Sequence, residues 1–196
     1  MKTRINELTK LVKGKSILHV GFACSPSFKE RIRKGIWLHE YLINSASLCC
    51  GYDIDSFAVE VLSNEYGYKN IYSTIGELYS QHNQFDYLLL PEVIEHVDNP
   101  VSFIRNFIDV YPTSKIIITV LNAFRLRNFI NAFVGVEAIN SDHRYWFTPV
   151  TINKIMNQCG ICDGKIMMVE SYPRNIFIRM FLYLFPMFHD TIIWYV

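Results

Sequence analysis

Two short segments of the chain bring carboxylates and histidines close together. The first runs Glu92-Val93-Ile94-Glu95-His96-Val97-Asp98-Asn99-Pro100, and the second runs Asp142-His143-Arg144-Tyr145-Trp146-Phe147-Thr148-Pro149. A neutral imidazole with a pKa of about 6.5 can accept a proton near neutral pH, so His96 and His143 are candidate general bases. Each has a structural alternative, because His96 could hydrogen-bond the backbone of a helix start and His143 could hold its own segment in place.

The first segment also has the spacing of a metal site. Glu92, Glu95 and His96 stand at positions i, i+3 and i+4, so on a helix they would share one face and could ligate a divalent ion. The same spacing is common at solvated helix starts. We therefore predict that these residues bind no metal.

The spacing of apolar residues predicts the elements that position these side chains. Short β-branched runs alternate with segments of helical period, which is typical of a parallel sheet with crossover helices. Seven runs are expected to be strands: 16–20, 48–52, 70–74, 87–90, 115–120, 165–169 and 191–196. The sequence therefore predicts one α/β domain over residues 1–196, built on a doubly wound, seven-stranded, mostly parallel sheet.

Capping residues predict where the helices begin. Three capped starts are expected, at Asp55, at Asn99-Pro100 and at Thr148-Pro149, because these side chains can accept hydrogen bonds from free first-turn amides. Residues 36–47 are expected to form a helix, and residues 22–34 are expected to be irregular.

In open α/β sheets, ligands bind beyond the carboxyl ends of the strands, where the strand order reverses. The first expected strand leads into Gly21-Phe22-Ala23-Cys24-Ser25-Pro26, the second into Asp53 and the fourth into Pro91-Glu92. Asp53 is placed to accept hydrogen bonds from two ribose hydroxyls. We therefore expect a nucleoside-containing ligand at this edge of the sheet.

The order of these segments resembles that of class I S-adenosylmethionine-dependent methyltransferases over residues 15–196, and most of all the bacterial group that acts on small molecules and surface saccharides. The resemblance is carried by Gly51-Tyr52-Asp53-Ile54-Asp55, by Phe85-Asp86-Tyr87 and by the two histidine-containing segments. It implies a Rossmann-like methyltransferase fold with an antiparallel last strand. It also implies S-adenosylmethionine as cofactor and methyl transfer to an oxygen or nitrogen of a small-molecule or saccharide acceptor.

The resemblance further implies roles for individual residues. Those implied to bind the cofactor are Gly21, Phe22, Ala23, Asp53, Ile54, Ile75, Gly76, Glu77 and Glu92. Asp53 would hold the ribose and Ile54 would lie against the adenine. Glu92 would lie under the sulfonium at the mouth of the acceptor site, and so joins His96 and His143 as a catalytic candidate. Residues 122–150 would form an insertion or lid on the acceptor side.

Two departures from the family pattern support an alternative function. The first loop holds one glycine, Gly21, where the family is glycine-rich, and Ile75 stands where the family tends to place an aspartate that binds the adenine amino group. A methyltransferase-like binding or scaffold protein without catalysis is the alternative. A nicotinamide-dependent oxidoreductase fits less well, because the first loop has no G-x-G-x-x-G motif that opens onto a helix.

The composition bears on partners and compartment. The 19 lysines and arginines nearly balance 18 acidic residues, for a net charge of +1, so no nucleic-acid partner is expected. Five scattered cysteines and no signal peptide favour the cytoplasm. The apolar run 176–188 is too short to span a bilayer, and we expect it to be buried or at an interface, with peripheral membrane contact as the alternative. The sequence leaves a homodimer open.

Overall fold

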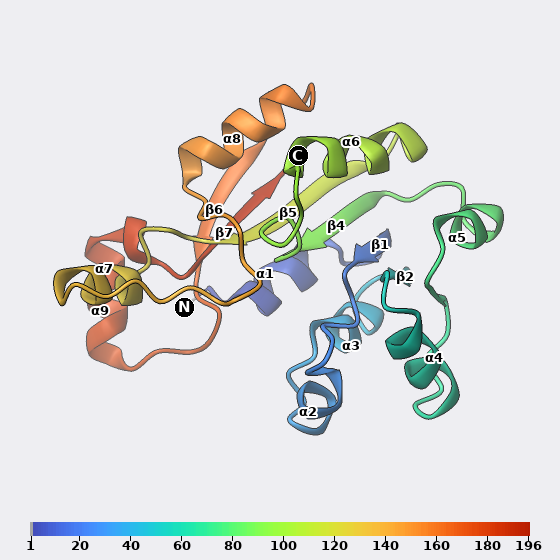
Figure 1. The fold of residues 1–196 in the computed structure, drawn as a ribbon, viewed down its shortest axis with the longest axis horizontal. Helices are drawn as coiled ribbons and strands as arrows, with labels where there is room; N and C mark the ends of the chain where they lie inside the picture. The colour runs from blue at the N-terminus through green and yellow to red at the C-terminus, as the bar shows by residue number, and fades with distance from the viewer. Residues whose placement is uncertain (1) are drawn as a thin grey trace.

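A seven-stranded sheet forms the centre of the computed structural model, which describes residues 2–196 (Figure 1). The strands are β1 (Ser16–Val20), β2 (Leu48–Tyr52), β3 (Ile71–Tyr72), β4 (Tyr87–Pro91), β5 (Lys115–Leu121), β6 (Lys165–Val169) and β7 (Thr191–Tyr195). Their order is β3-β2-β1-β4-β5-β7-β6. The first five strands are parallel, and β7 runs antiparallel to both β5 and β6. The predicted doubly wound sheet with an antiparallel last strand is therefore confirmed.

Nine α-helices and one 3₁₀ helix are described in residues 2–196. They are α1 (Arg4–Leu11), α2 (Phe28–Arg33), α3 (Leu38–Ile43), α4 (Ser56–Asn64), α5 (Ile75–Gln81), α6 (Pro100–Val110), α7 (Leu126–Phe133), α8 (Pro149–Gln158), α9 (Ile176–Leu184) and η1 (Pro186–Phe188). The three predicted caps are present, since the side chains of Asp55, Asn99 and Thr148 each accept a hydrogen bond from a first-turn amide.

The core lies in layers on both faces of the sheet. Consecutive strand residues face opposite sides, so Leu88 packs in the layer under α6 and α8, whereas Leu89 packs in the layer under α1 and α3. Figure 1 shows α6 and α8 on one side of the sheet and α2 and α3 on the other. The fully buried central strands explain the continuous apolar runs from which they were predicted.

Two helix predictions need correction. Residues 22–34 are not irregular throughout, because Phe28 is buried and anchors α2, which Gly35 ends with a φ of +62°. The helix expected over residues 36–47 is shorter, because Trp37 has an extended backbone and donates its buried indole N–H to the carbonyl of Phe22. The indole anchors the chain just ahead of α3.

The tight packing of Gly164 against Trp194 predicts a large loss of stability on substitution. A Cβ at Gly164 would overlap the indole of Trp194, which is buried and donates its N–H to Asn153 at 2.7 Å. We expect Gly164→Ala to lower the free energy of unfolding by about 1–3 kcal/mol, measured by urea denaturation. Gly76→Ala is the matched control, because nothing lies within 4 Å of its added Cβ and alanine favours a helix. Equal free energies of unfolding of the two variants would contradict the tight packing of Gly164 against Trp194.

The apolar run that includes α9 is not buried in its own domain. Leu182 is the only buried residue of α9, so burial of this helix within its own domain is wrong, while a position at an interface stays a prediction. No helix within residues 2–196 is long and apolar enough to cross a bilayer.

Candidate functional site

A cavity of about 870 Å³ opens at the carboxyl ends of β1, β2 and β4. The sheet order reverses at this edge, since β1 lies between β2 and β4, and this is where open α/β sheets bind ligands. Six residues predicted for the site line the cavity: Gly21, Asp53, Ile54, Glu92, His96 and His143. Its volume lies within the range of about 300–1,000 Å³ that is usual for small-molecule and cofactor sites.

Gly21 is required by packing beneath the cavity. Its φ is +72°, and a Cβ built on it would lie 2.5 Å from Cγ2 of Val93. Any larger residue would therefore clash with the chain that follows β4 and adopt a disfavoured backbone conformation. Contact with Val93 alone therefore requires glycine at this position, and the cofactor-binding role of Gly21 stays a prediction.

Asp53 is a partly buried carboxylate that faces the cavity. One of its oxygens accepts the amide of Ala23 at 3.0 Å, and the other accepts the amide of Asp55 at 3.1 Å. Burial raises its pKa, although these two hydrogen bonds act against the rise. A carboxylate oxygen has more than one acceptor site, so Asp53 can fix the loop after β1 and still accept hydrogen bonds from a ligand.

Ile54 lies next to Asp53 with its side chain in the open. It is 84% exposed, which is high for a large apolar residue, and it lines the cavity. Its exposed surface is suited to contact with a flat apolar group such as a purine ring.

Glu92 forms an ion pair that was not predicted. Its carboxylate lies 2.5 Å from a guanidinium nitrogen of Arg4, the first residue of α1. Burial opposes the charge of Arg4, but the neighbouring Glu92 outweighs that effect and raises the pKa of the guanidinium. The Nε of Arg4 is buried without a hydrogen-bond partner. The ion pair therefore fixes the side chain of Glu92 beside the cavity, and its backbone has a φ of +53°.

The chain after β4 is not helical before Pro100, so Glu92, Glu95 and His96 do not share a helix face. Glu95 is fully buried, and its Oε1 accepts the amide of Leu121 at 3.0 Å. Burial raises the pKa of Glu95 to about 8. The helix geometry that suggested a possible ion site at these three residues is therefore wrong.

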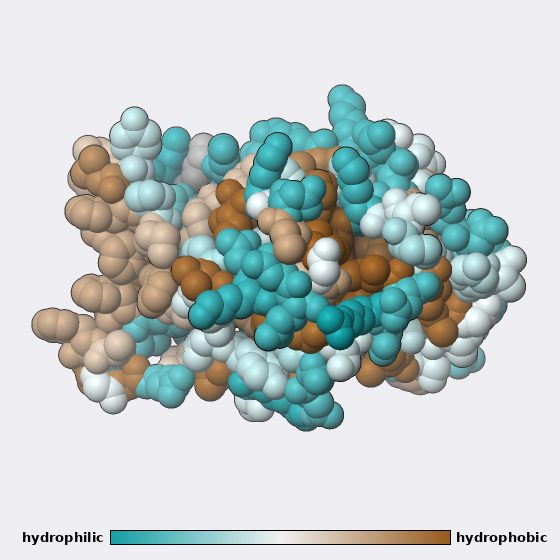
Figure 2. All heavy atoms as spheres, turned by 90° about the horizontal axis from the view of Figure 1, so that it is seen from above, coloured by the Kyte–Doolittle hydropathy of each residue, from teal (hydrophilic) through white to brown (hydrophobic). Residues whose placement is uncertain are grey.

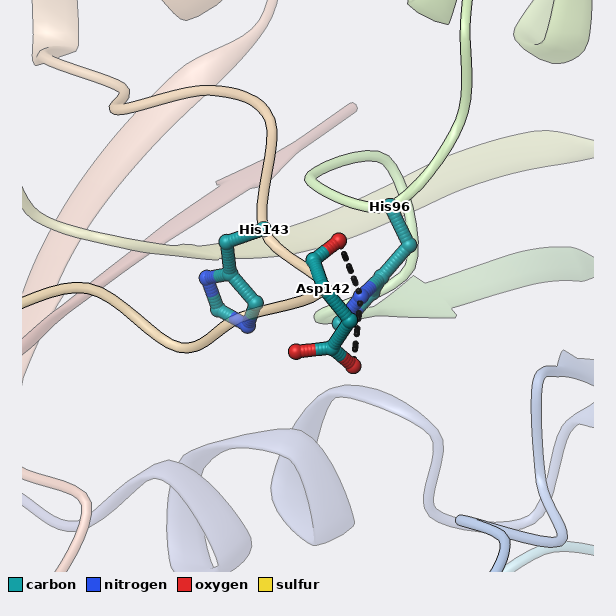
Figure 3. Close-up of side chains that lie close together, drawn as sticks. All are labelled: His96, Asp142 and His143. Atoms are coloured by element: carbon teal, nitrogen blue, oxygen red, sulfur yellow. Dashed lines mark hydrogen bonds and ion pairs between the residues drawn. The ribbon is translucent and has the colours of Figure 1, made fainter.

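His96, Asp142 and His143 lie together at the cavity (Figure 3). Nδ1 of His96 is 3.2 Å from a carboxylate oxygen of Asp142 and 3.3 Å from its backbone oxygen. The rings of His96 and His143 meet edge to face with centroids 4.5 Å apart. Burial, and then the neighbouring His96, lowers the pKa of His143. These three side chains are also close enough together for a metal ion, but their existing contacts orient His96 without one.

The segment before α8 is attached to the loop after β4 by two further hydrogen bonds, besides the contact between His96 and Asp142. The amide of Arg144 donates to the carbonyl of Glu95 at 2.8 Å, and the hydroxyl of Tyr145 donates to the carbonyl of Asp98 at 2.7 Å. These contacts bring His143 next to His96. The two histidine-containing segments of the sequence therefore form one wall of the cavity.

Five predicted residues do not line the cavity. Phe22 and Ala23 are fully buried below it, where Phe22 packs against Trp37. Ile75, Gly76 and Glu77 form the first turn of α5, and Ile75 packs on the core. Their roles in cofactor binding stay predictions.

Arg4 and Asp142 are the site residues that were not proposed from the sequence. Helix α1 could have been found, because Thr3 caps it and Ile5, Leu8 and Val12 have helical spacing. Nothing local indicates that Arg4 pairs with Glu92, since the two residues are distant in the chain.

No protein-family model and no curated protein matches the sequence significantly, whereas solved methyltransferase structures match nearly all of the fold. A SAM-dependent methyltransferase from Archaeoglobus fulgidus matches 98% of this chain over 91% of its own, with 17% identity and a TM-score of 0.55. Magnesium protoporphyrin IX methyltransferase from Synechocystis PCC 6803 was solved with bound S-adenosylhomocysteine (SAH). It matches 97% of this chain over 80% of its own, with 14% identity and a TM-score of 0.57. Small RNA methyltransferase HEN1 matches 98% of this chain over 24% of its own, with 16% identity and a TM-score of 0.62.

The chain has the class I methyltransferase fold. At these identities the likeness concerns the architecture, and a fold of this kind can host more than one function. The proteins that share the methyltransferase fold here are named for a porphyrin and for small RNA, so the fold does not fix the acceptor.

Proposed function

We propose that the protein is an S-adenosylmethionine-dependent methyltransferase that acts on an oxygen or nitrogen of a small-molecule or saccharide acceptor. The observation that carries the proposal is the pairing of Asp53 with the exposed Ile54 in a cavity at the strand-order reversal of a methyltransferase fold. An acidic side chain after the second strand and an apolar neighbour suit a ribose and an adenine.

The residues present fit S-adenosylmethionine. Asp53 would accept hydrogen bonds from the ribose hydroxyls and Ile54 would cover the adenine, while the chain around Gly21 and Cys24 would hold the methionine part. The cofactor, when bound, supplies an electrophilic methyl group. The protein's task is then alignment of the acceptor and exclusion of water.

His96 is our proposed general base. In its neutral form it can donate Nδ1–H to Asp142, which leaves Nε2 free to take a proton from the acceptor. Asp142 fixes this tautomer, and His143 packs against the ring. Glu92 is held by Arg4 and would add negative charge near the sulfonium.

The net charge of the chain supports the proposed class of acceptor, and its free cysteines support a cytoplasmic location. A net charge of +1 gives little attraction for a polyanion, which supports a small or saccharide acceptor over a nucleic acid. The five cysteines are all free, as expected in the cytoplasm.

A scaffold function without catalysis is the second candidate. It is favoured by the single glycine of the first loop and by Ile75, whose side chain packs on the core and offers no hydrogen-bond acceptor. Calorimetric titration with S-adenosylmethionine and SAH separates the two functions, with NADH as control. Micromolar binding of both sulfur ligands, followed by methyl transfer to a member of an acceptor panel, is the expected result. No binding of either ligand would favour the scaffold function.

Asp53→Ala tests the ribose site. We expect the Kd for SAH to rise at least tenfold, because a hydrogen bond to a charged group contributes about 1.5–3 kcal/mol. Asp109→Ala is the control, since Asp109 is exposed on α6, away from the cavity. Unchanged affinity in Asp53→Ala, with the fold intact by circular dichroism, would show that the ribose does not bind there.

A further inference from the structure

An exposed apolar face covers the end of the molecule formed by α7, α9 and η1. Figure 1 shows α7 and α9 together at this end, and Figure 2 shows apolar residues gathered there. The large apolar side chains exposed on it are Phe129, Ile130, Phe133, Val134, Ile176, Phe177, Met180, Tyr183, Leu184, Phe185 and Met187. Phe133 is 85% exposed, Phe177 79% and Tyr183 87%. Exposed apolar patches of this extent mark interaction sites.

This apolar face belongs to one packed unit. Phe188 of η1 lies 5.4 Å, centroid to centroid, from both Phe129 of α7 and Phe181 of α9. The exposed side chains therefore belong to helices that pack against one another, and not to separate loops.

The charged side chains within α7, α9 and η1 have one sign. Residues 122–136 and 175–189 contain three arginines, Arg125, Arg127 and Arg179, and no acidic residue. Arg127 and Arg179 are exposed. Arginines beside aromatic and aliphatic side chains are typical of helices that lie in the interface of an anionic membrane.

Three neighbouring cavities extend from the apolar face toward the candidate site. An apolar pocket of about 750 Å³ lies between α7 and η1, and it shares Asn131 and Phe188 with a second cavity. That second cavity shares Arg4, Glu92 and Leu121 with the cavity of the candidate site. The apolar pocket therefore neighbours the second cavity, which in turn neighbours the candidate site.

We propose that the apolar face of α7, α9 and η1 docks on the surface of an anionic lipid bilayer, with both helices lying in the plane of the headgroups. The apolar side chains would enter the acyl boundary, and Arg127 and Arg179 would pair with lipid phosphates. The docking does not depend on methyl transfer, so it can be tested without the cofactor.

Charge favours a bilayer over a second copy of the chain or an RNA. A two-fold dimer joins the same patch of both copies, which would bring arginines together with no acidic residue within α7, α9 or η1 to pair them. RNA binding relies on many phosphate contacts, whereas this face offers three arginines among a much larger apolar area.

Vesicle flotation of the full chain tests the docking. We expect binding to phosphatidylcholine vesicles that contain 30% phosphatidylglycerol to be at least tenfold tighter than binding to pure phosphatidylcholine, because each arginine near an anionic surface contributes roughly fivefold. Phe177→Asp with Tyr183→Asp should abolish binding. Arg127→Gln with Arg179→Gln should weaken it about tenfold or more, and provides a test that leaves the apolar side chains in place.

Matched controls come from elsewhere on the surface. Phe57→Asp changes an aromatic residue of α4 that is 70% exposed, and Arg33→Gln with Lys154→Gln removes two exposed charges from α2 and α8. All of these control variants should bind the vesicles as tightly as the unaltered chain does. Three outcomes would overturn the proposal: no flotation of the unaltered chain, equal losses in the controls, or a dimer in sedimentation that Phe177→Asp with Tyr183→Asp dissociates. Binding to a 20-nucleotide RNA but not to vesicles would overturn it as well.

Discussion

Replacement of His96 by asparagine should lower kcat by about 10²–10⁴, the usual contribution of a positioned general base, with the Kd for SAH unchanged. Asparagine keeps a polar group near Asp142 but cannot accept the proton at the position of Nε2. The measurement is a steady-state assay with the acceptor found in the panel, beside calorimetric titration of the same variant.

His143→Ala is the informative comparison for His96. His143 lies at ring contact with His96 and is hydrogen-bonded to Asn140, so its loss should change the position of His96 and cost less than the loss of the base. Asp142→Asn should give an intermediate loss, because the carboxylate that fixes the tautomer becomes an amide. Full activity in both histidine variants would remove histidine from the mechanism.

Replacement of Glu95 by glutamine should stabilise the protein at alkaline pH. The unfolded glutamate loses its proton at about pH 4.3, whereas burial, and then the neighbouring Glu92, raises the folded pKa to about 8. Between these pH values the folded state holds a proton that the unfolded state has lost. The free energy of unfolding therefore falls as the pH rises, and it stops falling on account of Glu95 above about pH 8. At pH 9 we expect Glu95→Gln to be more stable by roughly 5 kcal/mol, and near pH 4 to equal the original chain.

Chemical denaturation between pH 6 and 9 measures this difference. Burial lowers the pKa values of His19 and His39, so both histidines also make stability depend on pH. Their contribution cancels in the difference, because both variants contain the same two histidines. The amide of Leu121 keeps its acceptor, since glutamine retains Oε1. A stability difference that does not change with pH would contradict a buried, titrating Glu95.

Most of the fold could be predicted because buried strands and capped helices are local signals. The run 87–90 is apolar throughout because Leu88 and Leu89 face different core layers, and Asn99 ahead of Pro100 identifies the start of α6. Helix α2 was missed because it is short and Phe28 is its only buried residue. Helix α9 was expected to be buried or at an interface, because apolar composition does not distinguish a core helix from one that faces outward.

The candidate site could be predicted where it follows strand ends, and could not where it depends on long-range pairing. Asp53 and Glu92 were found because they directly follow β2 and β4. Arg4 was not found, since its role depends on a guanidinium that reaches Glu92 from the start of the chain. The helix face proposed for Glu92, Glu95 and His96 failed because the chain turns sharply at Glu92, where φ is positive.

A crystal structure of the protein grown with SAH tests the central claim most directly. We expect SAH in the cavity at the ends of β1, β2 and β4, with a ribose hydroxyl within hydrogen-bond distance of Asp53 and the adenine against Ile54. SAH bound away from Asp53, or crystals that never contain SAH at millimolar concentration, would contradict it.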